Sequence, residues 1–423
     1  MKGLIGESGD KLVRVATGLV SAGFCTFFFF RGRLFKKWDV RILLLFFLYV
    51  FGVCLFYYGF SYHLFTIASY FLWMNLGFLF LAFRTVKDPD RVLKYFTITY
   101  VAILVLLECV ILVHATLSLK EAIPGSDRLW GCFRVGRLCG MTNANTLSFH
   151  AMTAAALAMI QWLKGNARAK LIYGIALFLQ WFIMGMTNCR TTILSLSVCF
   201  MLFLFAAIYR RNFQKPKRGG IRACVGMIVV PILVPAILLL SFLLPTTICR
   251  GGISLVANAT RDQQLKKSMG LVYERNVTDV DTLADRKLIW ERSLELIFMN
   301  PRRTLLGTSL RSPENVNGAY EGRHDIPMLF AHNSFLEIFR KLGFTGLCFW
   351  IILLCLWGRK AISVYLDAKR DLGVMFLMAS GAGCILTGMT EMGPFPFYVV
   401  TAVPLLFFIC CGYCMRGDED EKA

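Results

Sequence analysis

Apolar stretches of about twenty residues recur along the chain of 423 residues, and they constrain its fold more than any other feature. A helix of that length crosses the hydrocarbon core of a bilayer. With 57% hydrophobic residues, the chain is also far more apolar than a soluble domain. We therefore predict an all-α integral membrane protein with about eleven (10–12) transmembrane helices. The stretches are 12–30, 42–60, 62–83, 95–119, 139–163, 171–187, 190–209, 223–247, 333–357, 372–390 and 397–414.

The formal charge of +20 is placed as in a membrane protein and not as in a nucleic-acid-binding protein. Of the 46 Lys and Arg residues, 22 lie in alternate short connections that hold only four acidic residues. Positive charge in such loops marks the cytoplasmic side of a bilayer. The partner of this charge is therefore the membrane, with no nucleic acid expected. The basic connections are 31–41, 84–94, 164–170, 210–222 and 358–370.

Alternation from these loops places segments 120–138, 248–331 and 391–396 on the outer face. Segment 248–331 is much longer than a simple connection between two spans, and it carries 12 basic and 10 acidic residues. We predict four parts in the chain. They are an N-terminal transmembrane bundle (1–247), a large extracytoplasmic loop (248–331), C-terminal transmembrane helices (332–414) and a cytoplasmic tail (415–423).

The large loop contains one predicted helix, beginning near Asp279 and Asp281. Acidic side chains there suit the positive end of a helix dipole, and apolar residues follow at helical spacing until Pro301 ends the pattern. Arg286 and Trp290 are four residues apart and so share one face of this helix. The outer side thus carries a helix with a basic residue on it.

Four further polar clusters meet the same outer side. They contain Arg137 with Asn143 and Asn145, Arg190, His332 with Asn333, and Glu391. Each has an ordinary explanation, because an arginine at a span end reaches toward headgroups, an arginine on a loop helix can face solvent, and His332 or Glu391 can cap backbone groups. Their gathering on one side favours a shared site. Arginines offer permanently charged, fork-shaped donors for phosphate oxygens, and a neutral imidazole accepts a proton from a hydroxyl. These types suit a doubly negative lipid, such as a lipid diphosphate.

Five stretches, taken in order, resemble the O-antigen ligase and polymerase superfamily of membrane glycosyltransferases. They are "GRLCGMTNANTLSFHAMTAAALA", "TNCRTTILSLS", "DRKLIWERSLELIFMNPRRTLLG", "HNSFLEIFRKLGFTGL" and "LTGMTEMGPF", which span about residues 137–396. The chain departs from the usual pattern at Cys189, where a small hydroxyl residue is common, and at "LLGTSL", where Gly-x-Gly is common.

The resemblance implies that His332 is catalytic and that Arg190 and Arg286 bind the diphosphate, with Arg137 at a weaker family position. Asn333 and Glu391 are implied as supporting residues. The donor would be a polyprenyl-diphosphate-linked glycan, and the acceptor a glycan, a glycolipid or a protein. The expected reaction is a metal-independent inverting glycosyl transfer in polysaccharide assembly. It would use no cofactor and take place on the outer face of a prokaryotic plasma (inner) membrane.

Several alternatives remain open at this stage. A polymerase and a ligase share this chemistry and differ in the acceptor, and the sequence does not separate them. We favour the polymerase slightly, only because polymerization is a common task for such chains. A transporter or flippase for lipid-linked glycans would explain the spans and arginines, but such proteins usually carry ionisable residues within spans, and here only Glu108 is an acidic residue in mid-span. A non-catalytic scaffold of an envelope assembly is the third alternative.

Overall fold

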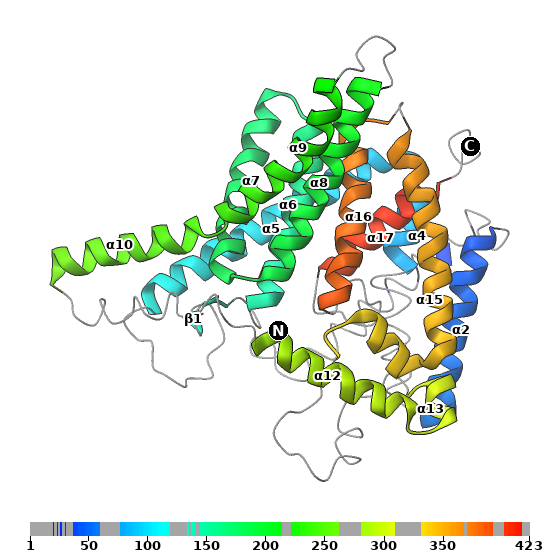
Figure 1. The fold of residues 1–423 in the computed structure, drawn as a ribbon. Helices are drawn as coiled ribbons and strands as arrows, with labels where there is room; N and C mark the ends of the chain where they lie inside the picture. The colour runs from blue at the N-terminus through cyan, green and yellow to red at the C-terminus, as the bar shows by residue number, and fades with distance from the viewer. Residues whose placement is uncertain are drawn as a thin grey trace.

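Helices make up nearly all of the described part of the chain and pack as a bundle of long rods (Figure 1). The computed structural model describes residues 37–59, 77–118, 133–134, 137–139, 144–213, 221–261, 281–308, 331–367, 370–391 and 402–416, with a few single residues between 20 and 30. The helices are α2 (Trp38–Tyr58), α4 (Gly77–Thr85), α5 (Pro89–Ser118), α6 (Ala144–Lys164), α7 (Ala167–Thr187), α8 (Arg190–Phe213), α9 (Ile221–Ser241), α10 (Leu244–Thr260), α12 (Asp281–Phe298), α13 (Pro301–Leu306), α15 (Ser334–Leu366), α16 (Leu372–Thr390) and α17 (Val403–Cys414). Two short antiparallel strands, β1 (Phe133–Arg134) and β2 (Arg137–Leu138), precede α6.

In the described residues, eight helical segments are long and apolar enough to cross a membrane. Each coincides with one of the predicted stretches, which confirms a helical fold with several membrane-length helices. The predicted spans 12–30 and 62–83 lie outside the described residues except for single positions and α4. The last prediction, 397–414, corresponds to the shorter apolar helix α17. The count of about eleven spans therefore stays a prediction.

Helices α6 and α16 form the centre of the bundle. Of their most apolar windows, 78% and 72% of the residues are buried, a larger share than in any other candidate span. Buried alanines at 154, 155, 156 and 158 let neighbouring helices approach α6 closely, as small residues do in membrane proteins. On α16, Phe376 packs edge-on against Phe200 and Phe203 of α8, with ring centroids 5.2 and 5.3 Å away. The two helices are therefore the central packing elements of the bundle.

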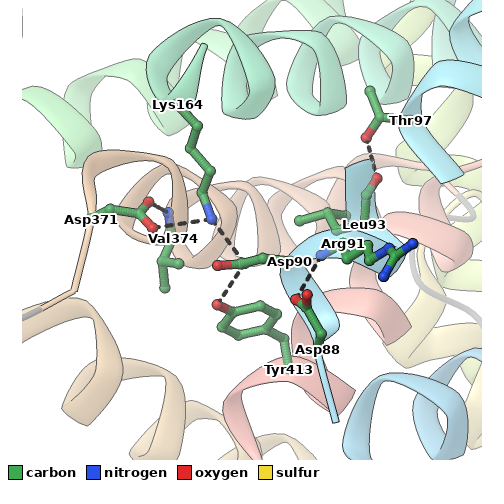
Figure 2. Close-up of polar contacts among 9 residues, drawn as sticks. All are labelled: Asp88, Asp90, Arg91, Leu93, Thr97, Lys164, Asp371, Val374 and Tyr413. Atoms are coloured by element: carbon green, nitrogen blue, oxygen red, sulfur yellow. Dashed lines mark hydrogen bonds and ion pairs between the residues drawn. The ribbon is translucent and has the colours of Figure 1, made fainter. Parts of the chain in front are cut away.

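Figure 2 shows a polar cluster that joins four helices at one end of the bundle. Lys164, the last residue of α6, forms ion pairs with Asp90 of α5 at 2.8 Å and with Asp371, the N-cap of α16, at 3.1 Å. The hydroxyl of Tyr413 on α17 donates to the same Asp90 carboxylate at 2.9 Å. These residues lie in or beside basic connections, so the sequence predicts this end to be cytoplasmic. We call this set of four residues the basal cluster.

The helix predicted in the large loop is confirmed. It is α12, which lies with α13 across one end of the bundle in Figure 1. Pro301 occupies the first turn of α13, and Asn300 caps that helix by accepting from the backbone N–H of Arg303 at 2.9 Å. Helix α10 occupies the first residues of the segment assigned to the loop, running from Leu244 to Thr260.

Helix α15 is broken at Gly343, whose φ of 67° and ψ of −174° are non-helical. Carbonyls beside the break accept from outside the helix: Arg340 from the Thr308 N–H at 3.0 Å, and Leu342 from the Tyr49 hydroxyl at 2.6 Å. Gly343 also lies against the backbone of the last turn of α13, since a Cβ there would stand 2.3 Å from the Leu305 carbonyl. The break therefore docks the start of α15 onto the end of α13.

Replacing Gly343 by alanine should lower the free energy of unfolding by about 2 kcal/mol or more, because a side chain is strained at this φ and meets backbone atoms. Gly358→Ala in the same helix is the matched control, since a Cβ there meets nothing within 4 Å. It should be neutral or stabilising by up to about 1 kcal/mol. Thermal unfolding of the purified protein in detergent measures both. A Gly343→Ala variant as stable as its control would contradict the contact.

Candidate functional site

His332 lies just before Asn333, the N-cap of α15, at the end of the bundle opposite the basal cluster. The separation follows from α6, whose 21 residues rise about 31 Å between its two ends. The side chain of His332 is 41% exposed, and its Nδ1 is 2.9 Å from Oε2 of Glu391, which is only 6% exposed. Glu391 directly follows α16. The structure thus joins two predicted site residues that are 59 positions apart in sequence.

The backbone on both sides of His332 is fixed by side chains. The indole N–H of Trp290 on α12 donates to the Ala331 carbonyl at 2.8 Å, and the Ala331 N–H donates to Glu337 at 3.0 Å. Asn333 caps α15 by accepting from two backbone N–H groups, and its amide donates to the Met389 carbonyl at 3.0 Å. His332 itself has a φ of 48°, a conformation that a non-glycine residue keeps only when its surroundings hold it. The imidazole is therefore presented by a rigid turn.

The other charged residues at the start of α15 form a buried ion cluster of one carboxylate and two cations. Glu337 accepts a fork of two hydrogen bonds from Arg340, at 2.6 and 3.2 Å, and lies 3.2 Å from the Lys341 ammonium. The three side chains are almost fully buried. Because Glu337 also accepts from Ala331, this buried ion cluster supports the turn that carries His332.

Arg137 reaches the same site through a partner. Its Nε donates to the Thr187 carbonyl at the end of α7 at 2.7 Å, and one terminal nitrogen donates to Oδ1 of Asn145. The Asn145 amide then donates to Oε1 of Glu391 at 3.4 Å. A continuous chain of hydrogen bonds therefore runs from β2 through α6 to the residue that contacts His332.

Arg190 and Arg286 occupy different situations. Arg190 is the first residue of α8, follows the left-handed cap Asn188 of α7, and is exposed. Within the described part of the chain, its guanidinium has no hydrogen-bond or ion-pair partner. Arg286 belongs to α12, one turn before Trp290, but its side chain lies outside the described residues. Whether both arginines face His332 therefore stays a prediction.

Trp290 and Asn145 are the site residues whose contacts were not predicted. The sequence identified Trp290 only as part of a helical apolar pattern and Asn145 only as a polar residue in the first turns of a span. The available signal was a polar side chain at the end of an apolar helix, where an unpaired amide is costly. As for a metal, the described residues contain no group of three or more His, Cys, Asp or Glu side chains able to hold one.

A family model described as O-Antigen ligase matches residues 175–351 of the chain. The match confirms the resemblance to the O-antigen ligase and polymerase superfamily. Arg190, Arg286 and His332 lie inside the matched region, whereas Arg137 and Glu391 lie outside it. None of the curated proteins matches the chain. The family and the helices together indicate a multi-pass membrane enzyme of the O-antigen ligase or polymerase type.

Glu337→Gln should destabilise the protein by about 3 kcal/mol, because it removes the carboxylate that pairs with two buried cations. Glu291→Gln is the matched control. It disrupts only an exposed pair with Lys287 at 3.7 Å, and the expected cost is below about 1 kcal/mol. Denaturation in detergent compares the two. Equal small effects would show that the buried cluster does not stabilise the turn.

Proposed function

We propose that this chain, whose residues 175–351 match the O-antigen ligase family model, transfers a glycan from a polyprenyl diphosphate carrier to a sugar hydroxyl. The contact of 2.9 Å between His332 Nδ1 and Glu391 Oε2 is the observation that carries the proposal. A carboxylate beside Nδ1 favours the proton on that nitrogen and leaves Nε2 as an acceptor. In this proposal His332 is the general base.

The proposed reaction is a single displacement. Nε2 of His332 takes the proton of the acceptor hydroxyl, whose oxygen attacks the anomeric carbon of the donor sugar. The bond between that carbon and the phosphate oxygen breaks, and polyprenyl diphosphate leaves with the bonding electrons. Attack from the side opposite the leaving group inverts the anomeric configuration. Glu391 stabilises the imidazolium that forms.

Arg190 is the described residue best suited to the leaving diphosphate. Its guanidinium is exposed, and none of the described residues forms an ion pair with it. A planar, permanently charged fork matches phosphate oxygens and stabilises the charge that grows on them. Arg286 stands one helical turn from Trp290, which contacts the residue before His332. The proposal assigns both arginines to the diphosphate, which makes a divalent metal unnecessary.

The placement of charges supports an outward-facing site. The basal cluster lies beside the basic connections predicted to be cytoplasmic, and His332 lies at the other end of α6 and α16. Beside the site, Phe298 of α12 and Phe339 and Phe344 of α15 form a row of edge-on rings. Phe298 and Phe344 are exposed, so this row offers an apolar track for a prenyl chain.

Cells that carry His332→Ala should make protein at the normal level but only unextended glycan, because the acceptor hydroxyl keeps its proton. Gel analysis of glycan length measures the effect. His114→Ala, on the exposed face of α5, is the matched control and should leave the length distribution unchanged. Normal glycan in the His332→Ala strain would contradict the general-base role. Lipid-linked units trapped on the cytoplasmic leaflet would indicate transport instead.

The same strain distinguishes the two acceptor classes. A polymerase joins lipid-linked units, so its loss leaves single units on the carrier in the outer leaflet. A ligase transfers finished chains, so its loss leaves full-length chains that are not attached to the final acceptor. We expect single units on the carrier, because we favour the polymerase over the ligase.

Chelation tests the metal-independent form of the reaction. The purified protein should release polyprenyl diphosphate from a lipid-linked saccharide at an unchanged rate in EDTA, because arginine side chains neutralise the leaving group. The loop contains one Asp-x-Asp pair, Asp279 and Asp281, which could in principle hold a divalent cation. A loss of rate in EDTA that Mg²⁺ restores would overturn this part of the proposal.

A further inference from the structure

The guanidinium of Arg137 is held at two points by the protein itself. Its Nε is fixed by the Thr187 carbonyl at 2.7 Å, at the negative end of the α7 dipole, and a terminal nitrogen is fixed by Asn145. An arginine that binds a diphosphate needs guanidinium N–H groups that are available to donate. Arg190 is exposed, whereas Nε and one terminal nitrogen of Arg137 already donate within the protein. The two arginines therefore differ in what they can do: Arg137 lies in β2 and is held by the protein, whereas Arg190 is the exposed first residue of α8.

The chain of partners determines how the Asn145 amide is oriented. Arginine has only donors, so the atom that faces Arg137 must be the amide oxygen. A carboxylate has only acceptors, so the atom that faces Glu391 must be the amide nitrogen. Asn145 thus accepts a hydrogen bond from Arg137 and donates one to Glu391, which links the two charged groups. The second Glu391 oxygen contacts Nδ1 of His332 at 2.9 Å.

We propose that Arg137 and Asn145 are positioning residues that control the protonation of His332 through Glu391, instead of ligands of the diphosphate. The inference rests on the proposed role of His332 as a base and deepens it. The amide N–H of Asn145 donates to one Glu391 oxygen and thereby orients the second oxygen toward Nδ1. The charge of Arg137, two hydrogen bonds away, limits how strongly Glu391 attracts the imidazole proton.

Other charged groups around this turn act on His332 less directly. Glu337 accepts from the backbone of Ala331, and its charge is offset by Arg340 and Lys341. Arg190 begins α8 next to Cys189, whose buried thiol lies within the electrostatic reach of both Arg137 and Glu391. Since these groups are unchanged in the variants below, any difference reports on the Arg137–Asn145 pathway.

The substitution Asn145→Asp tests the inference without requiring turnover. It preserves the side-chain shape and the acceptor for Arg137, but it removes the donor to Glu391 and adds a negative charge. Diethyl pyrocarbonate acylates only unprotonated imidazole, so the pH dependence of its reaction at His332, followed by mass spectrometry of the His332 peptide, reports protonation directly. The midpoint should move upward by about one pH unit.

Asn166→Asp is the matched control, because it adds the same charge at the cap of α7 near the basal cluster. Its side chain accepts from the Ala169 N–H, a role in which aspartate serves equally well. The midpoint at His332 should be unchanged in this variant. If Asn145→Asp also leaves the midpoint unchanged, the positioning role is overturned. This result would leave the base role of His332 untouched, since that role is tested separately by His332→Ala.

A second variant, Arg137→Gln, separates positioning from diphosphate binding and applies even if Asn145→Asp does not fold. The positioning role predicts an upward shift of the His332 midpoint and a fall in kcat at neutral pH that is recovered at higher pH. The KM for lipid-linked saccharide extracted from the host membrane should stay the same. A rise in KM of about tenfold, with no shift of the midpoint, would show that Arg137 binds the donor and would contradict the inference.

Discussion

Polar side chains in this helix bundle are tied to one another, because a bilayer provides no water to solvate them. Two such polar clusters lie at the two ends of α6 and α16. At one end, Lys164 joins Asp90 and Asp371, and Tyr413 completes the basal cluster. At the other end, the partners are His332, Glu391, Asn145 and Arg137. The central helices therefore separate the two polar clusters and also form the core of the bundle.

The charged residues around the start of α15 fall into a buried, paired set and the partly exposed His332. Glu337, Arg340 and Lys341 are buried and paired with one another, so they support the turn that carries His332. His332 is the ionisable group of that turn left partly open, and Trp290 of the loop helix fastens the residue before it. The loop helix thus contacts the turn that carries His332, at the end of the bundle where the proposed site lies.

The sequence predicted local features well and contacts between distant segments poorly. The apolar stretches and the helix that became α12 follow from composition and spacing within one segment. The sequence also predicts that the site residues share one side of the membrane, and this stays a prediction. It gave no sign that Gly343 docks against Leu305, or that Arg137 is held by Thr187. Such contacts depend on how helices pack, and one sequence carries no record of packing.

The resemblance to a known superfamily identified His332 and Glu391 but not the difference between the arginines. Arg137 and Arg190 look alike as residues at span ends, and only their partners distinguish them. Arg137 is bound within the protein, whereas Arg190 is exposed. A role taken from a motif therefore says which residues belong to a site, and the hydrogen bonds say which of them remain available to a substrate.

The most direct measurement is the release of polyprenyl diphosphate from a lipid-linked saccharide by the purified protein in liposomes, comparing wild type with Glu391→Gln across pH. The account predicts that wild type releases the carrier only when an acceptor glycan is present. Glu391→Gln should be much slower at every pH, because no carboxylate stabilises the imidazolium of His332. Carrier release at the wild-type rate by Glu391→Gln would contradict the account.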